Sequence, residues 1–222
     1  MTQSPYRARE AESYEEDRAH ERHWRRERDY VHELLRRRTP KYMLDAPVGT
    51  GRFASSCAPE TRLVGIDLSI SMLQVAKRRM ALPVPARLLL ARGSLAALPF
   101  SRGAFDLTLC CRFMHLIPAS QLAPMFRELA RVTAGRVCVQ AYVKGPLHWR
   151  LQNRLRSLWR ALRPDRSASR GSEPWSHIRA HFHTEAALLD AAARAGLCAV
   201  SATQLDRYNA TRVMMYEWDS RP

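Results

Sequence analysis

The sequence predicts an α/β fold: a Rossmann-like, doubly wound sheet of about seven strands, mostly parallel, with helices on both faces. Two observations support this prediction. Between residues 42 and 143, short apolar runs typical of buried parallel strands alternate with amphipathic helical segments. Near the C-terminus, two strand-like runs at 198–205 and 212–218 are separated by about six polar residues, close enough for a hairpin. One of these two strands must therefore run antiparallel, at or near the edge of the sheet.

The first 40 residues differ in composition from the rest of the chain. They contain ten arginines and nine carboxylates. Their apolar residues fall at helical spacings and form a stripe of Trp24, Val31, Leu34 and Leu35. Pro40 ends this helix, because proline cannot continue one. We therefore expect an N-terminal charged helical lid at residues 1–40 and one folded domain at 41–222.

The elements of that domain follow from its apolar runs and capping residues. Strands are expected at 42–46, 63–66, 87–91, 105–111 and 136–143, and helices at 69–80 and 119–132. Ser69 is placed to cap the first of these helices, with Ile70 and Val75 among its apolar positions. A last helix begins after the capping residue Thr184 and ends at Gly196, a plausible left-handed position.

A basic insert at 144–180 separates the fifth strand from the last helix. It carries nine basic residues against Asp165 and Glu173, and its first half is amphipathic. We expect the insert to cap a substrate pocket, with an apolar face turned toward the core that consists of Leu151, Leu155, Leu158 and Leu162. A nucleic-acid arm, a membrane-surface helix and a helix packed away from the pocket are the alternatives.

The turn after the first strand has the residues expected of a nucleotide site. Gly49 and Gly51 follow Pro47 in a turn that opens toward a helix, which brings backbone amides close to a ligand. Asp67, at the tip of the second strand, is placed to accept hydrogen bonds from ribose hydroxyls. The turn does not fit a dinucleotide fingerprint, since Pro47 stands at the first glycine position. An ordinary tight turn with a helix-capping aspartate is the structural alternative.

Five motifs in order give the chain a family resemblance. They are Asp45-Ala46-Pro47-Val48-Gly49-Thr50-Gly51, the run 65–73, the run 93–100, Phe105-Asp106-Leu107 and the run 112–115. With these motifs, residues 44–143 resemble the nucleotide-binding core of class I S-adenosylmethionine-dependent methyltransferases. The resemblance implies S-adenosylmethionine as the cofactor. At residue 94 a serine stands where many members of the family have aspartate.

The resemblance also implies which residues contact the cofactor. Asp45, Gly49 and Gly51 would surround its methionine part, and Asp67 would hold the ribose. The adenine would lie against Leu68, Met72, Ser94 and Leu95. The full expected set is Asp45, Ala46, Pro47, Gly49, Gly51, Arg52, Asp67, Leu68, Met72, Gly93, Ser94, Leu95 and Cys111.

The expected activity is methyl transfer to an O, N or C atom of a small or medium-sized acceptor, anionic or amphiphilic in character. His115, just after the fourth strand, is the candidate catalytic residue, and a histidine that only supports the pocket is the alternative. No metal is expected, because His177, His181 and His183 have no cysteine or carboxylate at ligand spacing. The lack of a long apolar run and of an apolar signal core predicts a cytoplasmic protein.

Two other functions compete with this prediction. Basic residues outnumber acidic ones by 36 to 21, and a net charge of +15 would suit a methyltransferase that acts on RNA or another polyanion. That reading is less favoured because Cys110-Cys111-Arg112-Phe113 stands where base-amine methyltransferases carry Asn/Asp-Pro-Pro-Tyr/Phe. The other alternative is a non-catalytic binding protein with a methyltransferase fold.

Overall fold

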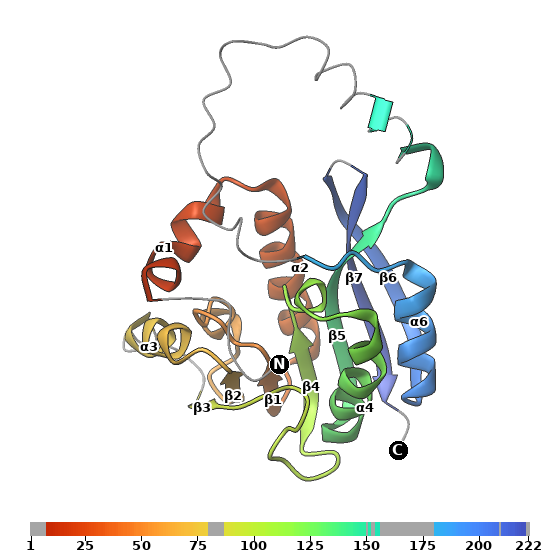
Figure 1. Ribbon diagram of the computed structural model, residues 1–222. Coiled ribbons are helices and arrows are strands. Elements are labelled where there is room, and N and C mark those ends of the chain that lie inside the picture. Colours follow the sequence, from red (N-terminus) through yellow and green to blue (C-terminus); the bar gives the residue numbers. More distant parts are fainter. Residues whose placement is uncertain are drawn as a thin grey trace.

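The computed structural model describes residues 8–79, 87–149, 151, 154–155, 180–208 and 210–220. Within these residues, seven strands form one sheet in the order β3-β2-β1-β4-β5-β7-β6 (Figure 1). The strands are β1 (Tyr42–Asp45), β2 (Arg62–Asp67), β3 (Arg87–Arg92), β4 (Phe105–Cys110), β5 (Thr133–Lys144), β6 (Leu197–Tyr208) and β7 (Thr211–Ser220). β1 to β5 pair in parallel, whereas β7 is antiparallel to both β5 and β6. The predicted fold class is confirmed.

The strand order reverses next to β1. From β1 the chain builds outward to β2 and β3 on one side, and β4 then returns to pair with the other side of β1. Such a reversal leaves a crevice beyond the carboxyl ends of the central strands, where ligands bind in open α/β sheets.

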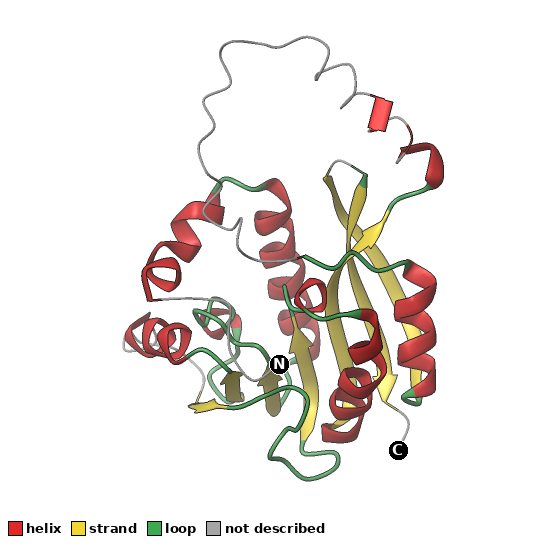
Figure 2. Ribbon diagram, in the orientation of Figure 1, coloured by secondary structure: helices red, strands yellow, loops and turns green. Residues whose placement is uncertain are grey.

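Each face of the sheet is covered by helices (Figure 2). Along each strand, successive side chains point to opposite faces. Leu44, Val137 and Val139 belong to the core under α4 (Leu122–Val132) and α6 (Glu185–Arg194). Met43 and Leu109 belong to the opposite core, which α2 (Arg22–Arg38) and the short helix η1 (Ala54–Ser56) cover. The N-terminal segment therefore supplies part of the protein's core.

The N-terminal segment contains two helices rather than the single helix expected. α1 (Ala8–Ala19) ends before Glu21, whose backbone is extended (φ −68°, ψ 126°), and α2 begins at Arg22. The Glu21 amide donates to the Arg18 carbonyl at 2.9 Å, and its carboxylate pairs with the Arg18 side chain. The apolar stripe predicted on this segment is buried along α2. No helix in the described part of the chain is long and apolar enough to span a bilayer.

Capping predictions for two other helices are confirmed. In α3 (Ile70–Arg79), the Ser69 hydroxyl accepts a hydrogen bond from the Met72 amide at 3.3 Å. At the start of α6, the Thr184 hydroxyl accepts from Ala187, and Gly196 beyond its end has φ +83°. Of the apolar positions predicted for α3, Val75 is buried, whereas Ile70, the first residue of α3, is 51% exposed.

The described part of the basic insert does not pack against the core. After β5, the Gly145 amide donates to the Ala210 carbonyl at the hairpin tip, so the chain continues past the end of the sheet (Figure 1). Leu151 and Leu155 are accordingly 53% and 56% exposed, and the prediction that they face the core was wrong. The other two leucines of that prediction, Leu158 and Leu162, lie outside the described residues, as does His177.

Candidate functional site

A cavity that opens to solvent lies beyond the carboxyl ends of β1, β2 and β4, at the reversal of strand order. Of the residues expected to contact a cofactor, those lining the cavity are Pro47, Gly49, Arg52, Asp67, Leu68, Met72, Gly93, Ser94, Leu95 and Cys111. Asp45, Ala46 and Gly51 stand beside them in the chain but are not part of the lining.

The turn after β1 has the backbone geometry that its glycines permit. Gly49 and Gly51 have φ of +54° and +73°, in the left-handed region that favours glycine. The Gly49 amide donates to Asp67 Oδ2 at 2.9 Å, and Asp67 Oδ1 accepts from the Ser69 amide at 2.8 Å. Burial raises the pKa of Asp67, although these backbone hydrogen bonds oppose the shift. Asp67 thus holds the turn against β2 while its carboxylate also lines the cavity.

Asp45 ends β1 with a fully desolvated carboxylate. Its side chain is 1% exposed, and neither oxygen has a hydrogen-bond partner among the described residues. Burial raises its pKa well above the usual value, the charge of Arg52 opposes this, and Asp67 and Glu27 add to it. Buried carboxylates without partners are costly, so this corner suits a ligand that carries hydrogen-bond donors or positive charge.

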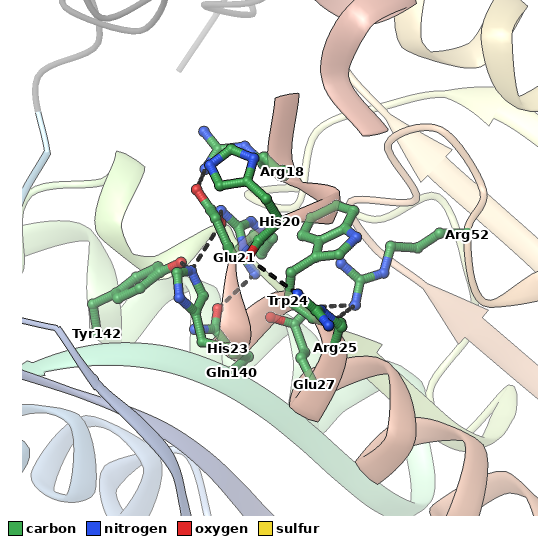
Figure 3. Close-up of polar contacts among 11 residues, drawn as sticks. Arg18, His20, Glu21, His23, Trp24, Arg25, Glu27, Arg52, Gln140 and Tyr142 are labelled. Carbon is green, nitrogen blue, oxygen red and sulfur yellow. Dashed lines mark hydrogen bonds and ion pairs between the residues drawn. The ribbon is translucent and has the colours of Figure 1, made fainter. Parts of the chain in front are cut away.

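α1 and α2 supply a wall of the cavity through residues that sequence reasoning did not identify. Tyr14, Trp24 and Glu27 line it. The Arg52 guanidinium carbon lies 3.6 Å from the Trp24 ring centroid, and Arg52 Nη2 lies 3.2 Å from both Glu27 Oε1 and the Trp24 carbonyl (Figure 3). A signal was present in the sequence, because Glu27 falls on the helical stripe between Trp24 and Val31, where a carboxylate is out of place.

Arg112 lines the cavity next to the Cys111 backbone, in a left-handed conformation with φ +56°. Its amide donates to Gln140 Oε1 at 2.9 Å, and its guanidinium lies 3.4 Å from Glu21. Glu21 also contacts His23 Nε2 at 3.0 Å and Arg18 at 3.1 Å. Burial alone would raise the pKa of Glu21, but the His23 hydrogen bond and the arginine charges lower it to about 2.

His115 lies in the short helix η2 (Met114–Leu116), behind the cavity lining. Its ring packs edge-on against Tyr142 with centroids 5.0 Å apart, and its Nδ1 is buried with no partner in the described part of the chain. Burial and the charge of Arg112 lower the pKa of His115 to about 3, so the imidazole is neutral near pH 7. Burial raises the pKa of Tyr142 to about 12, and its hydroxyl lies 3.2 Å from His23 Nε2.

A comparison with protein families matches the part of the chain that forms this site. The sequence model of a family described as "Methyltransferase domain" matches residues 43–135. Residues 43–135 are thus similar to a methyltransferase domain. This similarity agrees with the family that the ordered motifs predicted. Trp24 and Glu27, on α2, lie outside the matched range.

Two curated relatives share sequence with part of this chain. The malonyl-[acyl-carrier protein] O-methyltransferase of Legionella pneumophila is 33% identical over 110 residues, which are 48% of this chain and 37% of the relative. The demethylmenaquinone methyltransferase of Lactococcus lactis is 32% identical over 87 residues, 34% of each chain. The chain thus spans little more than a third of the length of these relatives.

Solved structures resemble the methyltransferase domain together with its flanking elements. Magnesium protoporphyrin IX methyltransferase from Synechocystis PCC 6803 with bound SAH has a TM-score of 0.68 at 15% identity, over 90% of this chain and 84% of that one. Geranyl diphosphate C-methyltransferase from Streptomyces coelicolor A3(2) has a TM-score of 0.62 at 15% identity, over 87% and 80%. At this identity the likeness establishes the fold.

Proposed function

We propose that this protein binds S-adenosylmethionine and transfers its methyl group to an O, N or C atom of a small or medium-sized acceptor. The observation that carries the proposal is the cavity at the reversal of strand order, lined by the residues that the methyltransferase motifs assign to the cofactor. The sequence relatives are methyltransferases named for malonyl-[acyl-carrier protein] and demethylmenaquinone, which supports methyl transfer as the activity.

The residues present fit this cofactor. Leu68, Met72 and Leu95 give one part of the cavity an apolar lining suited to a purine ring. Asp67 keeps its carboxylate at the cavity, where it would accept hydrogen bonds from the ribose hydroxyls. The desolvated carboxylate of Asp45 suits the charged methionine end. Ser94 also lines the cavity, and its hydroxyl oxygen would accept a hydrogen bond from the adenine amine.

When bound, the cofactor supplies a methyl group already activated by the sulfonium charge. The chain's own residues then have to exclude water and hold the acceptor in line with that methyl group. His115 and Tyr142 have pKa values of about 3 and about 12, so neither is tuned to take a proton near pH 7. We infer that the acceptor is deprotonated before it reacts, and that His115 supports or positions it rather than serving as an obligatory base.

The cavity wall around Arg112 and α1 suits an acceptor that is anionic or amphiphilic. The buried guanidinium of Arg112 lines the cavity, and Arg18 lies nearby, with the Glu21 carboxylate between them. Guanidinium groups bind carboxylates and phosphates through paired donors. Because the described leucines of the basic insert are exposed, we assign anion recognition to Arg112 in place of the insert.

The test is calorimetric titration of the purified protein with S-adenosylhomocysteine, a stable product analogue. We expect binding by the wild type, and a loss of about ten- to a hundredfold in affinity for Asp67→Ala, since a ribose hydrogen bond to a carboxylate is worth about 1–3 kcal/mol. Asp106→Ala is the matched control, because Asp106 also binds a backbone amide, that of Tyr42 at 2.8 Å, at the other end of β1. Absence of heat with wild type at millimolar ligand would refute the proposal.

A further inference from the structure

Glu27 has a buried side-chain carboxylate that the packing of the fold does not explain. It lies on α2, its side chain is 0% exposed, and it lines the cavity. Neither of its oxygens has a hydrogen-bond partner among the residues described. Its ion pair with Arg52, at 3.2 Å, is its nearest compensation. A charge buried in this way is costly unless something else completes its coordination.

Arg52 is fixed in place but is also incompletely bonded. Its guanidinium lies 3.6 Å from the Trp24 ring centroid and 4.4 Å from that of Phe53, and Nη2 donates to the Trp24 carbonyl. The other terminal nitrogen, Nη1, is buried and has no hydrogen-bond partner in the described part of the structure. Because two rings and a carbonyl hold the guanidinium, this free donor keeps its position beside Glu27 (Figure 3).

The charges in this corner do not balance. Asp45 and Glu27 contribute two carboxylates, and the charge of Arg52 acts on Asp45 while it pairs with Glu27. Arg112 is the next guanidinium along the wall, but its ion pair is with Glu21. This corner therefore has carboxylate oxygens and a guanidinium N–H side by side, both without hydrogen-bond partners among the described residues. A ligand with an ammonium group next to a carboxylate would bind to both. An α-amino acid group carries that pair of charges.

We propose that Glu27 binds the α-ammonium group of the cofactor's methionine end, with Arg52 Nη1 donating to its α-carboxylate. This inference rests on the proposed function, because it takes S-adenosylmethionine as the ligand. It makes α2, which lies outside the matched methyltransferase domain, a part of the cofactor site. Cofactor binding then stabilises the packing of α2 against the sheet, and this packing in turn strengthens cofactor binding, because coupling between two equilibria is reciprocal.

The experiment compares two ligands that differ only at this end. S-adenosylhomocysteine carries the amino-acid group, whereas 5′-methylthioadenosine keeps the adenosine and the thioether without it. For Glu27→Gln we expect calorimetry to show at least about a tenfold loss in affinity for S-adenosylhomocysteine and no change for 5′-methylthioadenosine. Glu33→Gln is the matched control on α2, because the Glu33 side chain is exposed and pairs with Arg36 at the surface.

A merely structural role for Glu27 predicts a different outcome. If Glu27 only holds α2 in place, both ligands lose affinity together, and equal losses or no loss at all would overturn the inference. If the wild type binds neither ligand, the proposed function falls as well, so the two failures are distinguishable.

A second measurement uses the wild type and does not depend on the variant folding. A deaminated S-adenosylhomocysteine, with hydrogen in place of the ammonium, should bind at least about tenfold more weakly than the parent compound. S-adenosylhomocysteine should also slow hydrogen exchange of the α2 amides around Glu27, and the deaminated compound should not. Equal affinity and equal protection by the two compounds would overturn the inference.

Discussion

The two N-terminal helices cover the same cavity but are attached in different ways. Along α2, Val31 and Leu34 are fully buried in the core beneath the sheet. Polar contacts add to this: Arg26 donates to the Leu205 carbonyl at 2.7 Å, and the Tyr30 hydroxyl donates to Glu217 at 2.6 Å. These contacts reach β6 and β7, at the far side of the sheet from α3. α2 is therefore a fixed wall of the cavity.

α1 is held mainly through charged side chains. It lies beside α3 (Figure 1), where Glu12 pairs with Arg78 and Glu15 pairs with Arg79 at 3.2 Å. All four side chains are a quarter or more exposed. Its buried apolar residues, Ala11 and Tyr14, form a small cluster with Trp24 and α3 rather than joining the main core. A segment with few buried contacts opens at low free energy, so α1 is the part of the cover suited to admit ligands.

The largest expected effect is on the free energy of unfolding, which should differ between a variant in α2 and a variant in α1. Leu34→Ala should lower the free energy of unfolding by about 2–5 kcal/mol, because it leaves a cavity in the core. Tyr14→Ala should cost less, since the loss is limited to the free energy with which α1 docks. Denaturant unfolding followed by circular dichroism measures both. A Tyr14 variant as destabilised as the Leu34 variant would show that α1 belongs to the same cooperative unit as α2.

A smaller effect should appear in α2 at alkaline pH. Burial and the hydrogen bond to Glu217 raise the pKa of Tyr30 from 10 to about 12. The folded state therefore keeps this proton where the unfolded state loses it, so the stabilisation is full below pH 10 and is lost as the pH rises to 12. Tyr30→Phe should cost about 1.5 kcal/mol at neutral pH and reduce the alkaline loss. Comparing the variant with wild type in unfolding titrations isolates Tyr30 from the other tyrosines, and parallel curves would contradict the prediction.

The smallest effect should be confined to α1. Exposed ion pairs contribute about 0.2–1 kcal/mol each and are screened by salt. Raising NaCl from about 0.05 M to about 1 M should therefore speed hydrogen exchange in α1 and leave the α2 amides from Val31 to Leu35 unchanged. In the variant carrying both Arg78→Gln and Arg79→Gln, the salt response of α1 should disappear. A salt effect of equal size on both helices would show that α1 and α2 are not attached in different ways.

Strands and capped helices were predictable because each leaves a local pattern. The parallel strands were located to within a few residues, and Ser69 and Thr184 cap their helices as expected. Element boundaries that depend on strand pairing were not predicted. β5 begins at Thr133, directly after α4, although Thr133-Ala134-Gly135 has the composition of a turn. The break near Glu21 contains no proline or glycine, and it depends on partners as distant in sequence as Arg112.

The cofactor side of the site was more predictable than the opposite wall. Gly49, Asp67 and Leu95 belong to ordered motifs, and the structure brings them to one cavity. Glu27 belongs to no such motif, and Arg112, although it begins the run 112–115, was not among the residues expected to contact the cofactor. Their positions depend on how α2 seats against the sheet and on the left-handed backbone at residue 112, and both are tertiary effects.

Trp24 links the two sides of the cavity through one indole ring. The guanidinium of Arg52 lies 3.6 Å from its centroid, at the side proposed for the cofactor, and that of Arg112 lies 4.8 Å away, at the side proposed for the acceptor. In evolutionary terms, this shared ring constrains divergence. A substitution at residue 24 changes the setting of both arginines at once, so a new acceptor preference gained there brings a change in cofactor affinity with it. His115 and Tyr142 are not part of the cavity lining, and changes there leave the contact between Trp24 and Arg52 in place, so new specificities should arise more readily at those positions.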